Sequence, residues 1–181
     1  MSTKGPPRGR VFIALWPPTA VAEPVARCAA AAASGSGRLV HAADLHLTLA
    51  FLGELSPAET SAAAEALHQT AHAAVELSLD RLGYFRRARV LWIGPHRTPQ
   101  ALLDLYALLW MQLESLGFEQ ERRLFRPHVT VARGTKGARS SVLDQSIVWQ
   151  ADTLVLATSK PGSAQSPRYR KLAATTLGPV D

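Results

Sequence analysis

The chain has 181 residues, which fits a single domain, and its hydrophobic content of 47% is that of a globular protein with a buried core. Its formal net charge of +6 excludes an acidic chain, and this composition also excludes a disordered one. The single cysteine, Cys28, cannot form an internal disulfide, which excludes a disulfide-stabilised scaffold.

The expected organisation is a disordered tail over residues 1–9 and one domain over 10–181. Short apolar runs bounded by proline or glycine predict strands, and longer runs that open on proline, serine or threonine predict helices. In chain order we expect a strand over 10–16, a helix over 17–33, a strand over 45–52, a helix over 56–74, a strand over 75–82, a basic loop or hairpin over 83–89, a strand over 90–93, a helix over 98–116, a strand over 127–132, a polar loop over 134–141, a strand over 148–158, a turn over 161–167 and a strand over 169–177. The lack of regular strand–helix alternation favours an α+β fold with antiparallel strands.

Several classes of protein are not expected from this sequence. No apolar run approaches the roughly 18–20 residues of a membrane span, and the start of the chain lacks the apolar core of a signal peptide. We therefore expect a cytoplasmic protein without a membrane partner. No glycine-rich phosphate loop is present, so neither a nucleoside triphosphate nor a dinucleotide cofactor is expected.

The positive charge is concentrated in one segment. The net charge is −2 over residues 1–80, +7 over 81–139 and +1 over 140–181. The arginines that stand out in the middle segment are Arg81, Arg86, Arg87, Arg89, Arg122, Arg123, Arg126, Arg133 and Arg139. They form either a solvated basic face or a cleft that faces phosphate groups, since the arginine fork suits phosphate oxygens.

One short pattern, His-x-Thr-x-Ala, occurs twice, at residues 46–50 and 128–132. The copies lie in predicted strands, where alternation puts the histidine and the threonine of each copy on one face. One such copy is uninformative, but two in matching apolar contexts indicate an internal duplication with a pseudo-two-fold axis. The duplication would turn two imidazoles toward one cleft.

Two imidazoles in one cleft suit acid–base chemistry at a phosphodiester, above all a strained cyclic one. One imidazole can take a proton from an attacking water or hydroxyl, while the other gives a proton to the leaving oxygen. The threonine hydroxyls and an arginine, either Arg126 or Arg133, could neutralise the developing charge, so that no metal is needed.

With these motifs the sequence resembles the two-histidine phosphoesterase superfamily, and within it the RNA 2′,3′-cyclic phosphodiesterases, formerly called 2′-5′ RNA ligases. The likeness is carried by residues 10–15, 46–53, 83–85, 89–94, 125–133 and 154–159 and by Tyr169. It implies two pseudo-symmetric lobes, with antiparallel sheets that line a central cleft and helices on the outside. It also implies hydrolysis of RNA 2′,3′-cyclic phosphate ends to 2′-phosphates without metal or cofactor, and 2′-5′ ligation as the reverse reaction.

The resemblance also implies a role for individual residues. His46 would be the proton donor to the leaving ribose oxygen and His128 the proton acceptor from water, an assignment that spacing alone does not provide. Thr48, Thr130 and Arg133 would hold the phosphate, and Phe51 would stack on the terminal base or sugar. The expected partner is RNA with cyclic phosphate ends, such as tRNA fragments, and the expected state is a monomer.

Other readings stay open from the sequence. His68 and His72 have a metal-ligand spacing on a predicted helix, but no third ligand is evident and a solvated helix face is expected. Tyr84 and Phe85, beside basic residues, could touch RNA, whereas Trp92 and Trp110 are expected in the core. The alternatives to the RNA enzyme are an RNA-end-binding module with incidental turnover, or a cyclic phosphodiesterase acting on small nucleotides such as ADP-ribose 1″,2″-cyclic phosphate.

Overall fold

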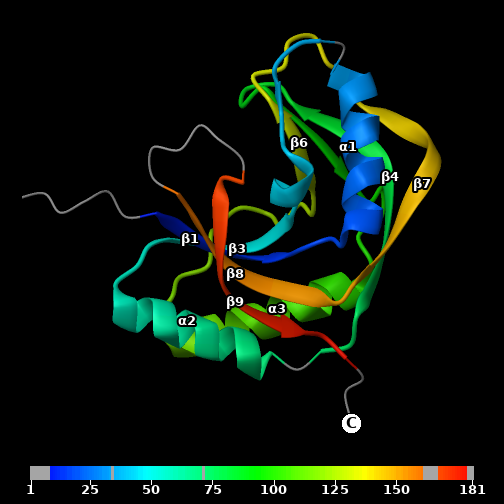
Figure 1. Ribbon diagram of the computed structural model, residues 1–181. Coiled ribbons are helices and arrows are strands. Elements are labelled where there is room, and N and C mark those ends of the chain that lie inside the picture. Colours follow the sequence, from blue (N-terminus) through cyan, green and yellow to red (C-terminus); the bar gives the residue numbers. More distant parts are fainter. Residues whose placement is uncertain (1–8, 34, 71, 161–166, 179–181) are drawn as a thin grey trace, which may run out of the picture.

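The computed structural model describes residues 9–33, 35–70, 72–160 and 167–178 (Figure 1). Apart from Gly9, the tail expected over residues 1–9 lies outside the described residues, and so does nearly all of the turn expected over 161–167. The described chain combines a large antiparallel sheet with three α-helices, which confirms the α+β prediction. None of the helices in this part of the chain is long and apolar enough to cross a membrane.

The elements follow in the order β1 (Arg10–Leu15), α1 (Thr19–Ala33), β2 (Arg38–Leu39), the 3₁₀ helix η1 (Ala42–Asp44), β3 (Leu47–Glu54), α2 (Pro57–Gln69), β4 (Val75–Phe85), β5 (Val90–Gly94), α3 (Gln100–Ser115), β6 (Val129–Arg133), β7 (Ser141–Ala151), β8 (Thr153–Ser159) and β9 (Tyr169–Thr176). Helix α2 begins as its sequence predicts, because Ser56 and Glu59 form a reciprocal capping box.

The sheet has the strand order β7-β4-β5-β6-β3-β1-β8-β9, with β2 paired to β6. It divides into two halves of four long strands, β3-β1-β8-β9 and β6-β5-β4-β7. In one half β1 leads through α1 to β3, and in the other β5 leads through α3 to β6, so the two strands that follow the histidines hold equivalent places. This repeated arrangement agrees with the duplication predicted from the two motifs.

The two halves meet where β3 and β6 pair, at Leu47 and Val129. The ladder is antiparallel and joins both halves into one continuous sheet. Both residues are almost fully buried, because the alternate face of these strands packs into the main core.

The connecting helices pack across the molecule. Helix α1 follows β1 but lies against β5, β6 and β7 of the other half. Helix α3 follows β5 but sends the Trp110 indole N–H to the carbonyl oxygen of Leu49 in β3, at 3.3 Å. It packs on α2, which covers β8 and β9 (Figure 1). Helix α1 thus packs on the half that contains β5, β6 and β7, and the pair of α2 and α3 packs on the half that contains β3, β8 and β9. These contacts tie the two halves together.

Several element boundaries differ from the sequence prediction. The strand expected over 148–158 is two strands, β7 and β8, with Asp152 between them, and β7 begins as early as Ser141. Most side chains of β7 are exposed, so this edge strand carries too little apolar alternation to be read from sequence. Strand β4 extends into the expected loop or hairpin, as far as Phe85, and the short strand β2 was not predicted.

The helix expected over 56–74 ends at Gln69. The buried Thr70 at its end donates its hydroxyl proton to the carbonyl oxygen of Ala66 at 2.8 Å, a local bond of the kind that competes with helix continuation. His72 therefore lies beyond the helix, and the helical face expected to carry both His68 and His72 does not exist.

Candidate active site

His46 is held at the start of β3 by the short helix η1. Asp44 and Leu45, the two residues before it, are buried and fix the main chain there. The Nδ1 atom of His46 lies 2.7 Å from the main-chain carbonyl oxygen of Asp44. Since a carbonyl oxygen can only accept, Nδ1 carries the proton and Nε2 is left for chemistry.

His128 is held in the same way at the start of β6. Its Nδ1 atom lies 2.7 Å from the carbonyl oxygen of Arg126, again two residues earlier. The buried Pro127 packs against β5 at Gly94, where an added Cβ would come within 2.7 Å of the Pro127 carbonyl oxygen. Glycine thus permits the close approach that seats this turn, and the second imidazole also keeps its Nε2 atom for other contacts.

The six residues singled out from sequence come together. His46, Thr48, Phe51, His128, Thr130 and Arg133 all line one cavity of about 660 Å³, here called the histidine cavity. Both histidines stand one residue before their strands rather than inside them. Continuing the Leu47–Val129 register by one residue puts His46 opposite Thr130 and His128 opposite Thr48, with all four on the same face. The imidazoles are therefore diagonal neighbours.

His46 lies in an aromatic enclosure that the motif alone did not predict. Its ring stacks on Phe12 at 4.8 Å and on Trp16 at 5.1 Å between ring centroids. These two rings are four residues apart along β1 and its continuation, so they lie on either side of the imidazole. The edge of Tyr169 completes the enclosure at 5.0 Å. In the sequence, the alternate apolar residues Phe12, Ala14 and Trp16 indicate that β1 has a second apolar face, opposite the one in the main core.

His128 has its own aromatic neighbours. Phe85 meets it edge-on at 5.1 Å, and Trp92 lies at 6.0 Å. Trp92 was expected in the core, but it is half-buried and flanks the site. It fits because Gly83 lies beneath it on β4, where a Cβ would overlap the indole ring. Trp110 does lie in the core, as predicted.

Burial sets the protonation of both imidazoles. Desolvation lowers the pKa of His46 to about 4, although the hydrogen bond to Asp44 and the Asp44 charge act in the opposite direction. Desolvation also lowers the pKa of His128, against the bond to the Arg126 carbonyl. The positive charge of Arg133 lowers both values further. Both imidazoles are therefore biased toward the neutral form.

The other candidates from the sequence lie elsewhere. His41 caps η1, its Nδ1 atom accepting from the amide of Ala43 at 3.2 Å. Cys28 is half-buried on α1, among the side chains packed on the core. Within the described ranges, no group of three His, Cys, Asp or Glu residues is arranged to hold a metal ion.

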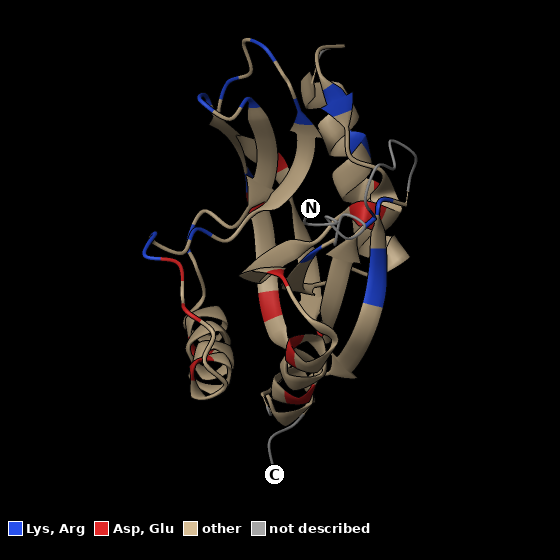
Figure 2. Ribbon diagram, turned by 90° about the vertical axis from the view of Figure 1, so that its left-hand side faces the viewer, with Lys and Arg blue, Asp and Glu red and all other residues tan. Residues whose placement is uncertain are grey.

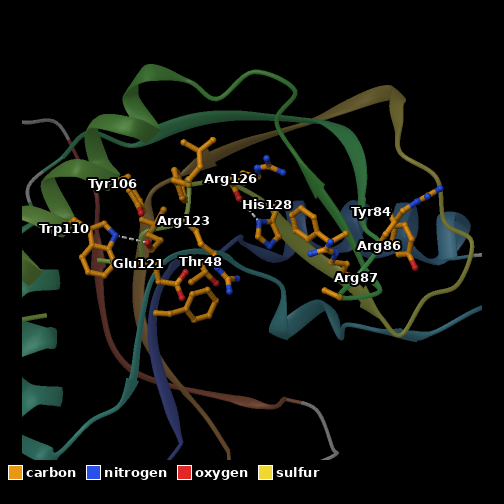
Figure 3. Close-up of a pocket in the computed structure, with 16 residues that line it drawn as sticks. Thr48, Tyr84, Arg86, Arg87, Tyr106, Trp110, Glu121, Arg123, Arg126 and His128 are labelled. Atoms are coloured by element: carbon orange, nitrogen blue, oxygen red, sulfur yellow. Dashed lines mark hydrogen bonds between the residues drawn. The ribbon is translucent and has the colours of Figure 1, made fainter. Parts of the chain in front are cut away.

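Of the two arginines weighed for phosphate contact, Arg133 lines the histidine cavity, whereas Arg126 lines a second cavity of about 820 Å³. This second cavity, here called the groove, adjoins the first, because Thr48, Phe51, Phe85 and His128 line both. Figure 3 shows the groove with Tyr106, Trp110 and Arg123 on one side of His128 and with Arg86 and Arg87 on the other.

The sequence profile of the 2′-5′ RNA ligase superfamily matches residues 17–160. The chain belongs to the 2′-5′ RNA ligase superfamily. Among its relatives is an Escherichia coli protein named RNA 2′,3′-cyclic phosphodiesterase, 38% identical over 103 residues, or 57% of this chain and 58% of the relative. A protein of the same name from Geobacillus stearothermophilus is 35% identical over 150 residues, or 76% of this chain and 47% of that one. The chain thus spans about half the length of these curated relatives.

Members of the superfamily with solved structures share the whole fold. Escherichia coli LigT complexed with NADP+ superposes with a TM-score of 0.83 at 28% identity and covers 96% of this chain and 100% of that one. The complex of LigT with 3′-AMP superposes with a TM-score of 0.81 at 29% identity, over 94% and 99% of the two chains. The fold likeness therefore extends over nearly the full length of this superfamily member.

Proposed function

We propose that this protein hydrolyses the 2′,3′-cyclic phosphate at an RNA end to a 2′-phosphate, by acid–base catalysis from two histidines without a metal. One observation carries the proposal: His46 and His128 line one cavity, and each has its Nδ1 atom bound to a main-chain carbonyl oxygen at 2.7 Å. Superfamily membership and the relatives named RNA 2′,3′-cyclic phosphodiesterase support the choice of substrate.

In the proposed reaction, the Nε2 atom of neutral His128 takes a proton from water as the water oxygen attacks phosphorus. The bond from phosphorus to the ribose 3′-oxygen breaks, and protonated His46 gives its Nε2 proton to that oxygen. A proton then moves from His128 to His46, directly or through solvent, and restores both starting forms. The direction of transfer follows the family resemblance, since the two sites are nearly equivalent in geometry.

The low pKa of His46 requires that the substrate itself favour the acid form. A bound phosphodiester brings a negative charge into a desolvated cavity, where it stabilises the imidazolium and raises the pKa of His46 above its value in the empty cavity. Substrate binding therefore favours the charged, proton-donating form of His46. This coupling ties proton donation to substrate binding.

The remaining cavity residues have roles that follow from their positions. The hydroxyls of Thr48 and Thr130 and the guanidinium of Arg133 would hold the phosphate oxygens and offset the charge that develops on them. Phe51, whose side chain is 58% exposed, offers a ring on which the terminal base can stack. Both histidines come from one chain, so we propose that a monomer is the active form.

The deciding experiment uses a short RNA that ends in a 2′,3′-cyclic phosphate, with EDTA present. The wild type should release a 2′-phosphate end, and His46→Ala and His128→Ala should each lower kcat/KM by at least about 100-fold. His68→Ala, on the exposed face of α2, is the matched control and should keep full activity. An inactive wild type would refute the enzyme, and loss of activity in EDTA would refute the metal-free mechanism.

The RNA that the protein meets in the cell is a separate proposal. Fragments of tRNA with cyclic phosphate ends are the candidates. Joining such an end to another RNA would follow the same path with a 5′-hydroxyl in place of water: its oxygen attacks phosphorus, the bond to the 3′-oxygen breaks, and a 2′-5′ linkage forms. Incubating a cyclic-phosphate RNA with a 5′-hydroxyl RNA at high concentration tests this joining reaction. A 2′-5′ linked product that requires both histidines would support it.

A further inference from the structure

The groove next to the histidine cavity extends beyond the residues of the proposed acid–base chemistry. It is larger than the histidine cavity, at about 820 Å³ against about 660 Å³, and touches only one of the two histidines. Neither His46, Thr130 nor Arg133 lines it. A volume of this size holds a ligand much larger than a phosphate group.

The walls of the groove join aromatic rings with arginines. Tyr106 and Phe125 stack at 4.0 Å between centroids, within 14° of parallel, on one side. Arg123 and Arg126 come from the same wall, and Arg86 and Arg87 come from the hairpin between β4 and β5. Against these four cations the groove has one lining carboxylate, Glu121. Rings on which bases stack, flanked by arginines that meet phosphates, are the features of sites for single-stranded nucleic acid.

Both walls are anchored to the rest of the fold. The carbonyl oxygen of Arg89, in the hairpin, accepts bonds at 3.2 Å from the amide and from the hydroxyl of Thr135. The Tyr84 hydroxyl donates to the Thr135 carbonyl oxygen at 2.7 Å. On the other wall the side-chain amide of Gln120 donates to the Tyr106 hydroxyl at 2.9 Å. The groove is thus a formed site whose arginines project from tethered elements.

Phe51 connects the two cavities, because it lines both and is well exposed. A base stacked on Phe51, with its cyclic phosphate between the histidines, would leave the rest of the strand at the mouth of the groove. Figure 2 shows basic residues in the loops at the top of the view and, with acidic residues beside them, in the loop that leads from α3 to β6. This distribution gives the groove the charge that an RNA backbone requires.

We propose that the groove binds the nucleotides that precede the cyclic phosphate in the RNA strand, so that the protein prefers an oligonucleotide to a cyclic mononucleotide. The proposal rests on the proposed function and names its substrate class. Bases stack on the aromatic side of the groove, and the arginines of both walls hold the phosphates. Small cyclic nucleotides fill the histidine cavity alone and gain nothing from the groove.

The test compares two substrates with the same terminal base, a cyclic mononucleotide and a trinucleotide with a 2′,3′-cyclic phosphate end. In the wild type, kcat/KM should be at least about tenfold higher for the trinucleotide, since only its additional bases can stack in the groove. Arg87→Ala and Arg123→Ala, one on each wall, should lower that ratio severalfold. Arg27→Ala, on the exposed face of α1, is the matched control and should leave the ratio unchanged.

The outcomes separate this proposal from the one on which it rests. Hydrolysis of both substrates with equal kcat/KM would overturn the role of the groove and leave the proposed function standing. A ratio that neither arginine variant changes would overturn it too. Hydrolysis of neither substrate would refute the proposed function and the groove proposal with it. Added salt should also raise KM for the trinucleotide more steeply than for the mononucleotide.

Discussion

Leu47 in β3 pairs with Val129 in β6, and this antiparallel pair joins the two halves of the sheet next to both histidines. Because Leu47 and Val129 point into the core, the residues on either side of each point into the histidine cavity. The seam therefore aligns two imidazoles that lie 82 residues apart in the sequence.

The first prediction concerns this seam. Leu47→Ala should lower the free energy of unfolding by about 2–5 kcal/mol, as burial in a core implies, and should also loosen the β3–β6 pairing. Leu154→Ala removes an equally buried leucine from β8, away from the seam. With both variants assayed where they are folded, kcat/KM should fall more for Leu47→Ala. Equal losses would contradict the seam's role in aligning the histidines.

A second prediction concerns stability against pH. The pKa of His46 is about 4 in the folded protein and 6.5 as a free side chain, so between these values the unfolded chain binds more protons. The folded protein favours the neutral form of His46, so this residue's contribution to the free energy of unfolding is fully present above about pH 6.5. The contribution is lost as the pH falls toward 4, and the loss is about 3 kcal/mol at most. His46→Gln should flatten the curve of unfolding free energy in this window, measured by denaturant titration. An unchanged curve would contradict the lowered pKa of His46 in the folded protein.

A third prediction concerns Arg133, whose charge lowers the pKa of both His46 and His128. Arg133→Ala should raise both pKa values, which NMR titration of the imidazoles would measure. If Arg133 holds the phosphate as proposed, the substitution should also lower kcat/KM by about 10- to 100-fold through loss of a charged hydrogen bond. Arg139→Ala, exposed in the following loop, is the control. Lower imidazole pKa values in Arg133→Ala would refute the electrostatic argument.

A fourth prediction concerns the buried carboxylate of Asp44. It accepts a hydrogen bond from the main-chain amide of Arg168, next to Tyr169, at 3.0 Å. Asp44→Ala would leave that amide without its acceptor and should destabilise the protein by about 1–3 kcal/mol. Asp44→Asn keeps an acceptor oxygen but removes the charge that raises the pKa of His46, so it should keep more stability and lower that pKa further. Thermal unfolding and NMR titration would distinguish the two effects. A higher His46 pKa in Asp44→Asn would contradict the conclusion that the Asp44 charge raises this pKa.

A fifth prediction concerns Gly83, whose place beneath Trp92 leaves no room for a Cβ atom. Gly83→Ala should displace the indole from its position beside His128 and destabilise the fold by about 1–3 kcal/mol. Gly178→Ala is a matched control, because a Cβ there meets nothing within 4 Å. The measurements are unfolding free energy and kcat/KM. Full activity in Gly83→Ala would show that the Trp92 position is irrelevant to His128.

Much of the site could be predicted from sequence because its residues repeat in a short local pattern. The two motifs identify His46 and His128, and alternation within a strand puts a threonine on the same face as each histidine. Helix α2 begins where its capping residues indicate. What failed were boundaries set by distant contacts, as at β7, whose exposed edge carries little hydrophobic pattern.

The sequence by itself determined which residues the proposed chemistry would use: two imidazoles and two hydroxyls in a repeated motif, and a basic segment. Only the tertiary structure decided which side chains surround that chemistry. Phe12, Trp16 and Tyr169 enclose His46 although they come from opposite ends of the chain, and Phe85 and Arg87 reach His128 and the groove from a hairpin. Such neighbours follow from strand order and helix packing, which join residues by burial rather than by nearness in sequence.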